Sequence, residues 1–584
     1  MYQKTYDLRK AGAVLYDKER GNGFVTEENR QKQELLQLAE LNTGFDVPYW
    51  YRGEHVTEIL SDEQGCYVDS EAIARRIGAD QNRLIPLCYK ADVPSTGNYV
   101  VEVEFFGKGD ILVFAGARRI VYKESVPEAK AINVSFVLNV CEIIPRGKTC
   151  LYENTSVNIA VLGQQIKLSR ILIKQVNCPT VYIAGDSTVT DQSAEYPYSP
   201  GTSYAGWGQM IGYYLPKGIA VSNHSHSGLT VESFRSEGHY AVIQAHIKPG
   251  DYLLMQFGHN DQKLMHLKAK DGYRDGLVAY IEETVSRGAY PIIVTPLARN
   301  SWKADDGTYN DLLAEYAEEC IAIGKQFHIP VIDLHARSMD FVVKKGLEGA
   351  KPFFFPKDFT HTNDYGAYKM AGFVVEDYLE KAKSGWADAY TKIAGEMSKY
   401  AMSKNTIVPT WEPENSEELP EIPEQYKNVP NPERSISLFD DLERPDETLT
   451  RVEALELVIK AARFFPTNVF NDIYDDIVGH EWYAGTVQCA YQNGIILPQM
   501  ATNKRFEPDR AVTLEEFLVF IMSGYKSRKE LPNDKPCIFD DKCTSYCMPF
   551  VRAACALGVI SEDDTLKETI TRRHAAEICK TLNI

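Results

Sequence analysis

The sequence predicts a multidomain protein with an all-β domain first, an α/β domain with a parallel sheet second, and an all-α repeat domain last. Three observations predict this fold class. Short apolar runs of period two fill residues 1–178, strands alternate with helices from residue 179, and a degenerate repeat of about 60 residues fills the end. A chain of 584 residues is also too long for a single hydrophobic core.

The first domain, residues 1–178, is predicted to be a β-sandwich of the jelly-roll or galactose-binding-like kind. Residues 98–106 alternate between polar and apolar side chains, as a half-buried strand does. Further short β-branched runs follow, separated by turn residues, at 110–116, 132–144, 157–162 and 166–176. We expect this domain to be a packing scaffold in preference to a sugar-binding module.

The second domain, residues 179–403, alternates short apolar strands with helical patterns. The predicted strands are 181–184, 252–257, 291–296 and 330–334, and the predicted helices include 312–327 and a closing helix from about 366 to 382, extendable to 403. This alternation predicts a parallel sheet between helices. Active sites of such sheets lie beyond the carboxyl ends of the strands, where two polar motifs of this chain begin.

The rest of the chain is predicted to be an acidic, proline-rich linker, 404–432, and a helical repeat domain, 433–584. Residues 490–496 recur as 554–560, and Thr450, Thr513 and Thr571 each stand where they can cap a helix. These segments resemble S-layer homology repeats, although Leu514 replaces the arginine of that pattern. The resemblance implies binding of cell-wall polysaccharide, and a purely structural role stays equally open.

Composition limits the partners. The net charge of −18 argues against nucleic acid and against an anionic membrane, and no apolar run is long enough for a transmembrane helix. The N-terminus lacks the apolar core of a secretory signal, which favours a cytoplasmic protein, while the repeats leave the cell surface open. The spacing of Cys537, Cys543, Cys547 and Cys555 differs from that of structural zinc sites, so we expect buried free thiols.

The chemistry is concentrated in a few short polar segments. Ser187 directly follows a predicted strand, and a serine hydroxyl needs a neighbouring base to act as a nucleophile. His361 can be that base, and Asp358, three residues earlier, can orient the imidazole. Three donors can stabilise an oxyanion: the N–H of Ser187, the N–H of Gly228 and the side-chain amide of Asn260. Together they predict a serine esterase.

These segments resemble the consensus blocks of the SGNH/GDSL hydrolases: 185–188, 223–228, 258–261 and 358–363. Within that superfamily, 185–189, 256–262 and 361–367 look like the rhamnogalacturonan acetylesterases, and 19–25 looks like a β-domain that precedes some bacterial members. The resemblance implies a flavodoxin-like three-layer fold, an acyl-enzyme on Ser187, acetylated pectic carbohydrate as substrate, and no metal or cofactor.

One departure leaves the substrate open. Gly228 is followed by Leu229 and Thr230, where the family commonly has Gly-Arg-Ser. Other plant glycans such as xylan therefore remain an alternative, as does a wall-binding protein with a decayed esterase domain.

Other polar and aromatic residues are candidates for supporting roles. His259, Trp207 and Asn363 are predicted to contact substrate, with aromatic rings stacking on sugar faces. Two of them have an alternative role that stays open: His259 can support the loop that holds Asn260, and Trp207 can pack in the core. His224, His226, His239 and His259 raise the alternative of metal-dependent phosphoester hydrolysis. We set it aside because the order of asparagine and histidine in 258–261 is reversed from that class and no upstream Asp-x-His is present.

Overall fold

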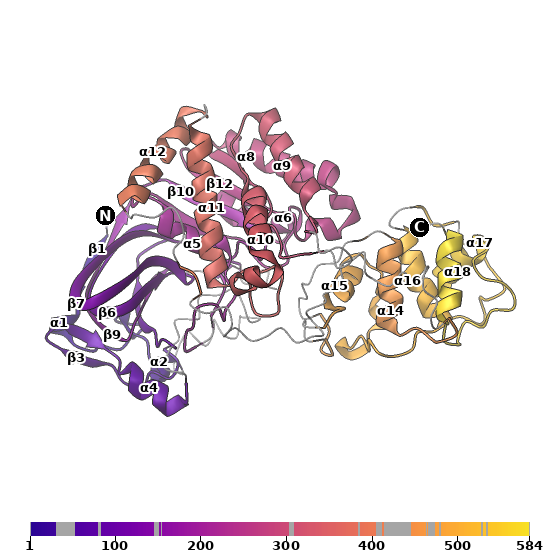
Figure 1. Cartoon of the computed structure of the whole chain (residues 1–584), viewed down its shortest axis with the longest axis horizontal. Helices are drawn as coiled ribbons and strands as arrows, with labels where there is room; N and C mark the ends of the chain where they lie inside the picture. Colours follow the sequence, from indigo (N-terminus) through magenta and orange to yellow (C-terminus); the bar gives the residue numbers. More distant parts are fainter. Residues whose placement is uncertain are drawn as a thin grey trace.

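The computed structural model of the chain describes residues 2–30, 53–79, 83–144, 151–152, 155–194, 196–302, 309–383, 386–403, 411–413, 445–462, 464, 473–477, 481–526, 529–532 and 535–582. An antiparallel β domain and an α/β domain lie against each other, and a helical domain lies beside the α/β domain (Figure 1). The expected linker 404–432 falls outside these residues except for 411–413. No helix within these ranges has both the length and the hydropathy needed to cross a membrane.

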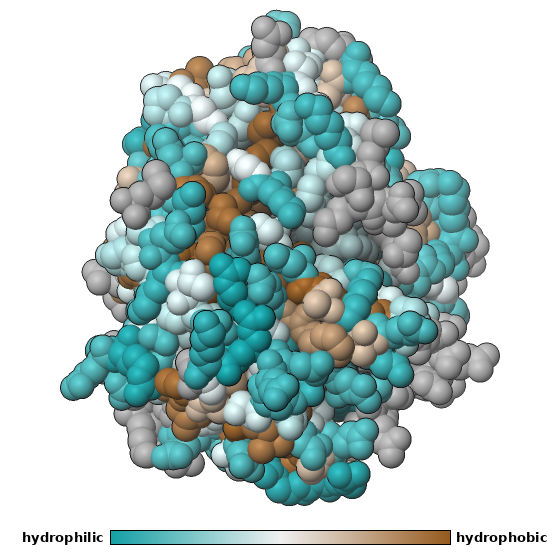
Figure 2. Space-filling model, turned by 90° about the vertical axis from the view of Figure 1, so that its left-hand side faces the viewer, coloured by the Kyte–Doolittle hydropathy of each residue, from teal (hydrophilic) through white to brown (hydrophobic). Residues whose placement is uncertain are grey.

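The N-terminal domain is one antiparallel sheet with short helices at its margin. Its strands are β1 (Gln3–Asp7), β2 (Asn22–Phe24), β3 (Leu60–Asp62), β4 (Gly65–Tyr67), β5 (Leu87–Asp92), β6 (Gly97–Ala115), β7 (Arg119–Val140), β8 (Ser156–Leu162) and β9 (Gln165–Val176), and its helices are α1 (Leu8–Ala11), α2 (Glu27–Arg30) and α4 (Ser70–Ile77). The sheet order is β2-β5-β8-β6-β9-β4-β3, with β1 on β9 and β7 on β6. Hydrophilic side chains cover most of the face that this end of the molecule presents, with smaller apolar patches (Figure 2).

The predicted two-sheet sandwich is instead a continuous sheet that curves into a half-barrel. One edge of β6 pairs with β7, while its other edge pairs first with β9 and then with β8. The β6–β7 register shifts between Gly107 and Gly109, and such irregularities let long strands bend. Both halves line one core, which contains Tyr89, Val101 and Ile159. The alternation of polar and apolar residues along one strand does not reveal which strands it pairs with. The sequence therefore could not predict that a long strand such as β6 runs through both halves of the sheet.

The α/β domain contains a five-stranded parallel sheet in the order β11-β10-β12-β13-β14. The strands are β10 (Thr180–Gly185), β11 (Ala220–Asn223), β12 (Tyr252–Gln256), β13 (Tyr290–Val294) and β14 (Val331–Ile332). This is the flavodoxin-like order, and its switch point lies between β10 and β12. The strand β11 was not among the predicted strands, and the closing helix is divided into α11 (Asp364–Ala382) and α12 (Asp388–Ser403).

Helices cover both faces of this sheet, so its strands are buried on both sides. Alternate strand residues pack either with α11 and α12 or with helices of the other face, as Ile183 and Tyr182 do in turn. The remaining helices of the domain are α5 (Trp207–Met210), α6 (Ser233–Ser236), α7 (His239–His246), α8 (Arg274–Ser286), α9 (Ala314–Phe327) and α10 (Leu334–Ala350). The three-layer arrangement expected for the second domain is therefore present, and the expected boundary at 178 lies between β9 and β10.

The half-barrel is joined to the α/β domain by a buried arginine. Phe114 and Leu162, on the outer face of the half-barrel, belong to the same core as the α/β sheet. Arg118, in the turn between β6 and β7, is 1% exposed and pairs with the fully buried carboxylate of Asp364 at the start of α11. Its guanidinium also donates to the carbonyl oxygens of Gln192 (3.0 Å) and Tyr204 (2.7 Å).

The C-terminal domain consists of α14 (Arg451–Ala461), α15 (Ala484–Gln492), α16 (Leu514–Lys526), α17 (Met548–Ala556) and α18 (Arg572–Leu582). Thr450 forms a capping box with Glu453 at the start of α14. Three equivalent residues form a closed ring of backbone hydrogen bonds, in which the N–H of Leu449 donates to Ile570, that of Ile570 to Val512, and that of Val512 to Leu449 (3.0–3.1 Å). The predicted helical repeats thus surround a central ring.

The four cysteines of this domain that were singled out carry free thiols. Cys547 is buried, and burial raises its pKa to about 12. Cys537, Cys543 and Cys555 are only half-buried, so the expectation of complete burial is wrong for these three. Their packing against the repeat core agrees with a structural role for these side chains.

We predict that Arg118→Met destabilises the α/β domain by about 3–5 kcal/mol, because Asp364 keeps a buried charge without its partner. Scanning calorimetry of the full chain should show the corresponding transition on the order of 10 °C lower. Lys344→Ala removes an exposed pair with Asp340 and is the matched control, with an expected effect of about 0–1 kcal/mol. Equal melting temperatures for the two variants would show that the buried pair does not join the domains.

Candidate active site

The residues predicted to react lie beyond the carboxyl ends of the central strands. Ser187 follows β10 by two residues, Asn260 follows β12, and His361 lies in the loop before α11. The switch point of the sheet brings the first two segments side by side, since β10 and β12 are paired neighbours. The sequence prediction that these segments converge at one edge agrees with this arrangement.

A chain of short hydrogen bonds connects Ser187, His361 and Asp358. Ser187 Oγ lies 2.8 Å from His361 Nε2, and His361 Nδ1 lies 2.7 Å from Asp358 Oδ2. An ionised carboxylate can only accept, so Nδ1 carries the ring hydrogen and Nε2 offers its lone pair to the serine hydroxyl. This is the arrangement needed to remove the serine proton.

The charge of Asp358 is maintained by its surroundings. Burial alone would raise the pKa of this carboxyl, but the His361 ring and the backbone N–H groups of His361 and Thr360 together hold it below its ordinary value. Those two N–H groups donate to Oδ1 over 2.9 and 2.7 Å, so one oxygen anchors the loop and the other remains for the imidazole. Asp358 is therefore ionised at neutral pH.

Tyr204 holds the imidazole from the side. Its ring meets the His361 ring edge to face at 5.6 Å and stacks on Phe355 at 3.6 Å between centroids. Its hydroxyl lies 3.4 Å from Asp358 Oδ2, and its carbonyl receives the bond from Arg118. The half-barrel therefore contacts the residue that packs on His361.

The two segments expected to stabilise an oxyanion are joined to each other. Gly228 has a φ of 85°, a conformation that glycine adopts without strain. The Asn260 amide donates to the carbonyl of Leu229, the next residue, over 3.0 Å. The oxygen of the same amide accepts a bond from the Lys263 amine over 2.9 Å. Both ends of the Asn260 side chain are thus fixed.

His259 and Trp207 occupy supporting positions, and neither is placed to contact substrate. His259 is buried, with Nε2 donating to the Leu297 carbonyl (2.8 Å) and Nδ1 3.3 Å from Asp186 Oδ2. Trp207 is 0% exposed and donates to Gln256 Oε1 over 2.8 Å. The expectation that its ring stacks on a sugar is wrong, because both faces are enclosed by the core.

Asn363 is likewise a structural residue. Its side chain is fully buried and caps α11 by accepting from the N–H of Gly366 (3.1 Å). Its amide donates to the carbonyl oxygens of Pro352 (2.9 Å) and Phe354 (3.0 Å). Every polar atom of the side chain is used within the protein, so the expected contact with substrate is wrong.

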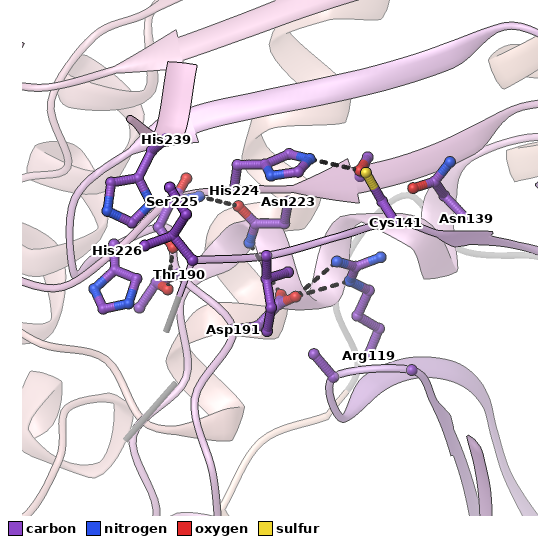
Figure 3. Close-up of a pocket in the computed structure, with 15 residues that line it drawn as sticks. Arg119, Asn139, Cys141, Thr190, Asp191, Asn223, His224, Ser225, His226 and His239 are labelled. Atoms are coloured by element: carbon purple, nitrogen blue, oxygen red, sulfur yellow. Dashed lines mark hydrogen bonds and ion pairs between the residues drawn. The ribbon is translucent and has the colours of Figure 1, made fainter. Parts of the chain in front are cut away.

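The other histidines lie around a small cavity of about 50 Å³, between the half-barrel and the end of β11 (Figure 3). Arg119 of the half-barrel pairs there with Asp191 (2.8 Å), and the rings of His226 and His239 lie 5.0 Å apart. His224 Nε2 lies 2.9 Å from Ser222 Oγ, and burial together with the Arg119 charge lowers the His224 pKa to about 3. These histidines are not gathered around shared carboxylates in the described part of the chain, and they do not join the Ser187 site.

Comparison with known proteins places the chain in a family. The model of the GDSL-like lipase/acylhydrolase family matches residues 183–367, and that of the S-layer homology domain matches residues 473–518. Rhamnogalacturonan acetylesterase RhgT of Bacillus subtilis is 35% identical over 34% of this chain and 89% of its own length. The probable rhamnogalacturonan acetylesterase YesY of the same organism is 32% identical over 34% of this chain and 92% of its own length.

A solved structure of the Bacillus subtilis protein YxiM covers 64% of this chain and 94% of its own, with 21% identity and a TM-score of 0.34. The chain belongs to the GDSL-like lipase/acylhydrolase family and is a carboxylic ester hydrolase. The resemblance to SGNH/GDSL hydrolases and to S-layer homology repeats, drawn from the motifs, is confirmed.

We predict that Trp207→Phe lowers stability and leaves substrate affinity unchanged. The substitution removes the donor to Gln256 and opens a small void, which together should cost about 2–4 kcal/mol. Calorimetry and steady-state kinetics on an acetylated oligosaccharide would measure both effects. A raised KM with an unchanged melting temperature would instead indicate that the indole contacts sugar.

Proposed function

We propose that this protein removes O-acetyl groups from an acetylated plant-wall carbohydrate, with pectic rhamnogalacturonan as the favoured substrate class. The observation that carries the proposal is the unbroken hydrogen-bonded chain from Ser187 through His361 to Asp358 at the sheet's switch point. The names of the relatives RhgT and YesY support the substrate class.

The proposed reaction has two steps. Ser187 Oγ attacks the acetyl carbonyl while His361 Nε2 takes its proton, and the same proton passes to the departing sugar alkoxide as the ester bond breaks. A water molecule, deprotonated by His361, then attacks the carbonyl carbon of the acetyl-enzyme. The proton passes from His361 to Ser187 Oγ as the acyl bond breaks, so acetate leaves and the serine is regenerated. The negative oxygen formed in each step is stabilised by the N–H groups of Ser187 and Gly228 and the amide of Asn260.

A wall-binding protein with a decayed esterase site is the alternative from another class. Decay would remove or separate the reacting groups, whereas here Ser187 and His361 are within hydrogen-bond distance and Asp358 is held by three contacts. A second Ser–His pair, Ser222 and His224, offers an internal comparison. Its histidine is held in the neutral form by its low pKa, and the described residues provide no carboxylate bonded to its other nitrogen.

The C-terminal domain is proposed to attach the esterase to cell-wall polysaccharide, on the basis of the S-layer homology match. Buried arginines link its repeats, with Arg451 bonded to Glu516 (2.6 Å) and Arg572 bonded to Glu453. Leu514 stands at the third equivalent position, so one of the three sites lacks its cation.

We predict that Ser187→Ala lowers kcat/KM for p-nitrophenyl acetate by roughly four to six orders of magnitude, as loss of a triad nucleophile does. Ser222→Ala is the matched control, because it removes the hydroxyl of the other Ser–His pair at the next strand, and its rate should equal that of the wild type. Equal activity of Ser187→Ala and wild type would contradict the proposed chemistry.

We further expect acetate release from acetylated rhamnogalacturonan fragments to exceed release from acetylated xylan. Since binding of the remote sugar residues contributes to the transition state, kcat/KM should distinguish the polymers more clearly than KM alone. A faster rate on xylan would transfer the proposal to that glycan, and Leu229 and Thr230 would be the first residues to examine, since they replace the polar residues common after Gly228.

A further inference from the structure

Lys263 is a buried cation next to the proposed oxyanion site. Its side chain is 0% exposed, and its amine donates to Asn260 Oδ1 over 2.9 Å. Asp186 and Asp261 attract this amine from a longer range, but no carboxylate of the described residues forms an ion pair with it, although such pairs are the usual way to stabilise a buried lysine. Burial and the charge of Arg299 lower the Lys263 pKa to about 7. Burying a lysine without an ion-pair partner costs folding free energy, so its presence here points to a functional role.

The hydrogen bond to Asn260 indicates what this role is. A carboxamide can rotate by half a turn and exchange its donor for its acceptor, which would turn an oxygen toward the developing negative charge. The Leu229 carbonyl can only accept, so it favours the orientation in which Asn260 Nδ2 faces Leu229 beside Gly228. The charged form of the Lys263 amine can only donate, and its bond to Asn260 Oδ1 reinforces the same orientation. A charge-assisted bond to the amide oxygen also polarises the N–H group, making it a better donor.

The C-terminal domain covers this lysine. Asn493, directly after α15, donates its amide to the Lys263 carbonyl over 2.6 Å and also to the Cys489 carbonyl over 2.8 Å. The thiol of Cys489, on α15, is completely buried and lies 4.0 Å from the same Lys263 oxygen. In Figure 1, α15 lies on the side of the repeat domain nearest the α/β domain. The contact therefore joins the repeat domain to the loop that carries Asn260.

We propose that Lys263 is a positioning residue that orients the Asn260 amide for oxyanion stabilisation, and that α15 of the repeat domain keeps Lys263 in place by docking over it. The proposal rests on the esterase function described above. Its consequence is that the C-terminal domain contributes to the rate of the reaction as well as to attachment. The catalytic groups themselves remain those of the α/β domain.

The first test uses the full-length protein and p-nitrophenyl acetate. Lys263→Met should lower kcat by about 10–100-fold with little change in KM, because an oxyanion donor acts mainly in the transition state. Lys263→Gln, which keeps a donor for Asn260 Oδ1, should recover part of the loss, and it replaces Lys263→Met if that variant fails to fold. Lys268→Met changes an exposed lysine of the same segment and should behave as wild type.

A double-mutant cycle separates positioning from general stabilisation. If Lys263 acts through Asn260, then Asn260→Ala combined with Lys263→Met should be no slower than Asn260→Ala alone. Multiplicative losses in the double variant would overturn the proposal, as would a wild-type kcat for Lys263→Met. Ser187→Ala is measured alongside, since activity remaining in that variant overturns the esterase mechanism instead.

The docking of α15 is tested by Asn493→Ala, with Gln499→Ala, at an exposed position of the same domain, as control. Asn493→Ala should lower kcat several-fold in the wild-type background and have no further effect in Lys263→Met. A wild-type kcat for Asn493→Ala would show that α15 does not hold the lysine.

Discussion

The chemistry of this protein depends on a carboxylate that can only accept hydrogen bonds. One oxygen of Asp358 holds two backbone N–H groups of its own loop, and the other takes the ring hydrogen of His361. The loop conformation, the ring orientation and the position of the ring proton are thereby fixed together. Ser187 needs only to lie at the end of β10 to meet a nitrogen that is ready to accept its proton.

The half-barrel takes part in this arrangement from outside the α/β domain. Arg118 reaches Asp364, which lies three residues after His361 in the chain, and the carbonyl of Tyr204, whose ring packs against the His361 ring. A domain that only bound sugar would not need a buried cation inside its neighbour. The interpretation of the half-barrel as a packing scaffold stays a prediction, and this buried contact is consistent with it. The cavity beside Arg119 lies at the same junction.

The sequence identified candidate reacting residues where a reactive residue type also stands directly after a predicted strand or before a predicted helix. Ser187, Asp358 and His361 could be named because each residue type follows a predicted strand or precedes a helix in a recognisable segment. Trp207 and Asn363 were misassigned because residue type does not reveal burial, which depends on the packing of distant elements. Arg118 gave no signal because its partners lie far along the chain. Lys263 bonds to Asn260 only three residues away, but the sequence did not show that its amine is buried or that Asn493 of the repeat domain lies against it. The half-barrel was missed because strand pairing, unlike strand alternation, is a long-range property.

The ring of backbone hydrogen bonds in the C-terminal domain sets a limit on its size. Many repeat proteins grow by stacking, and their ends stay open to further units. Here the N–H and C=O of Leu449, Val512 and Ile570 are all used within a closed cycle of three. A fourth unit could enter only by breaking a bond already made. The closed ring therefore limits the domain to three repeat units. Gene duplication that preserved the ring would have to add a second complete domain of three repeats.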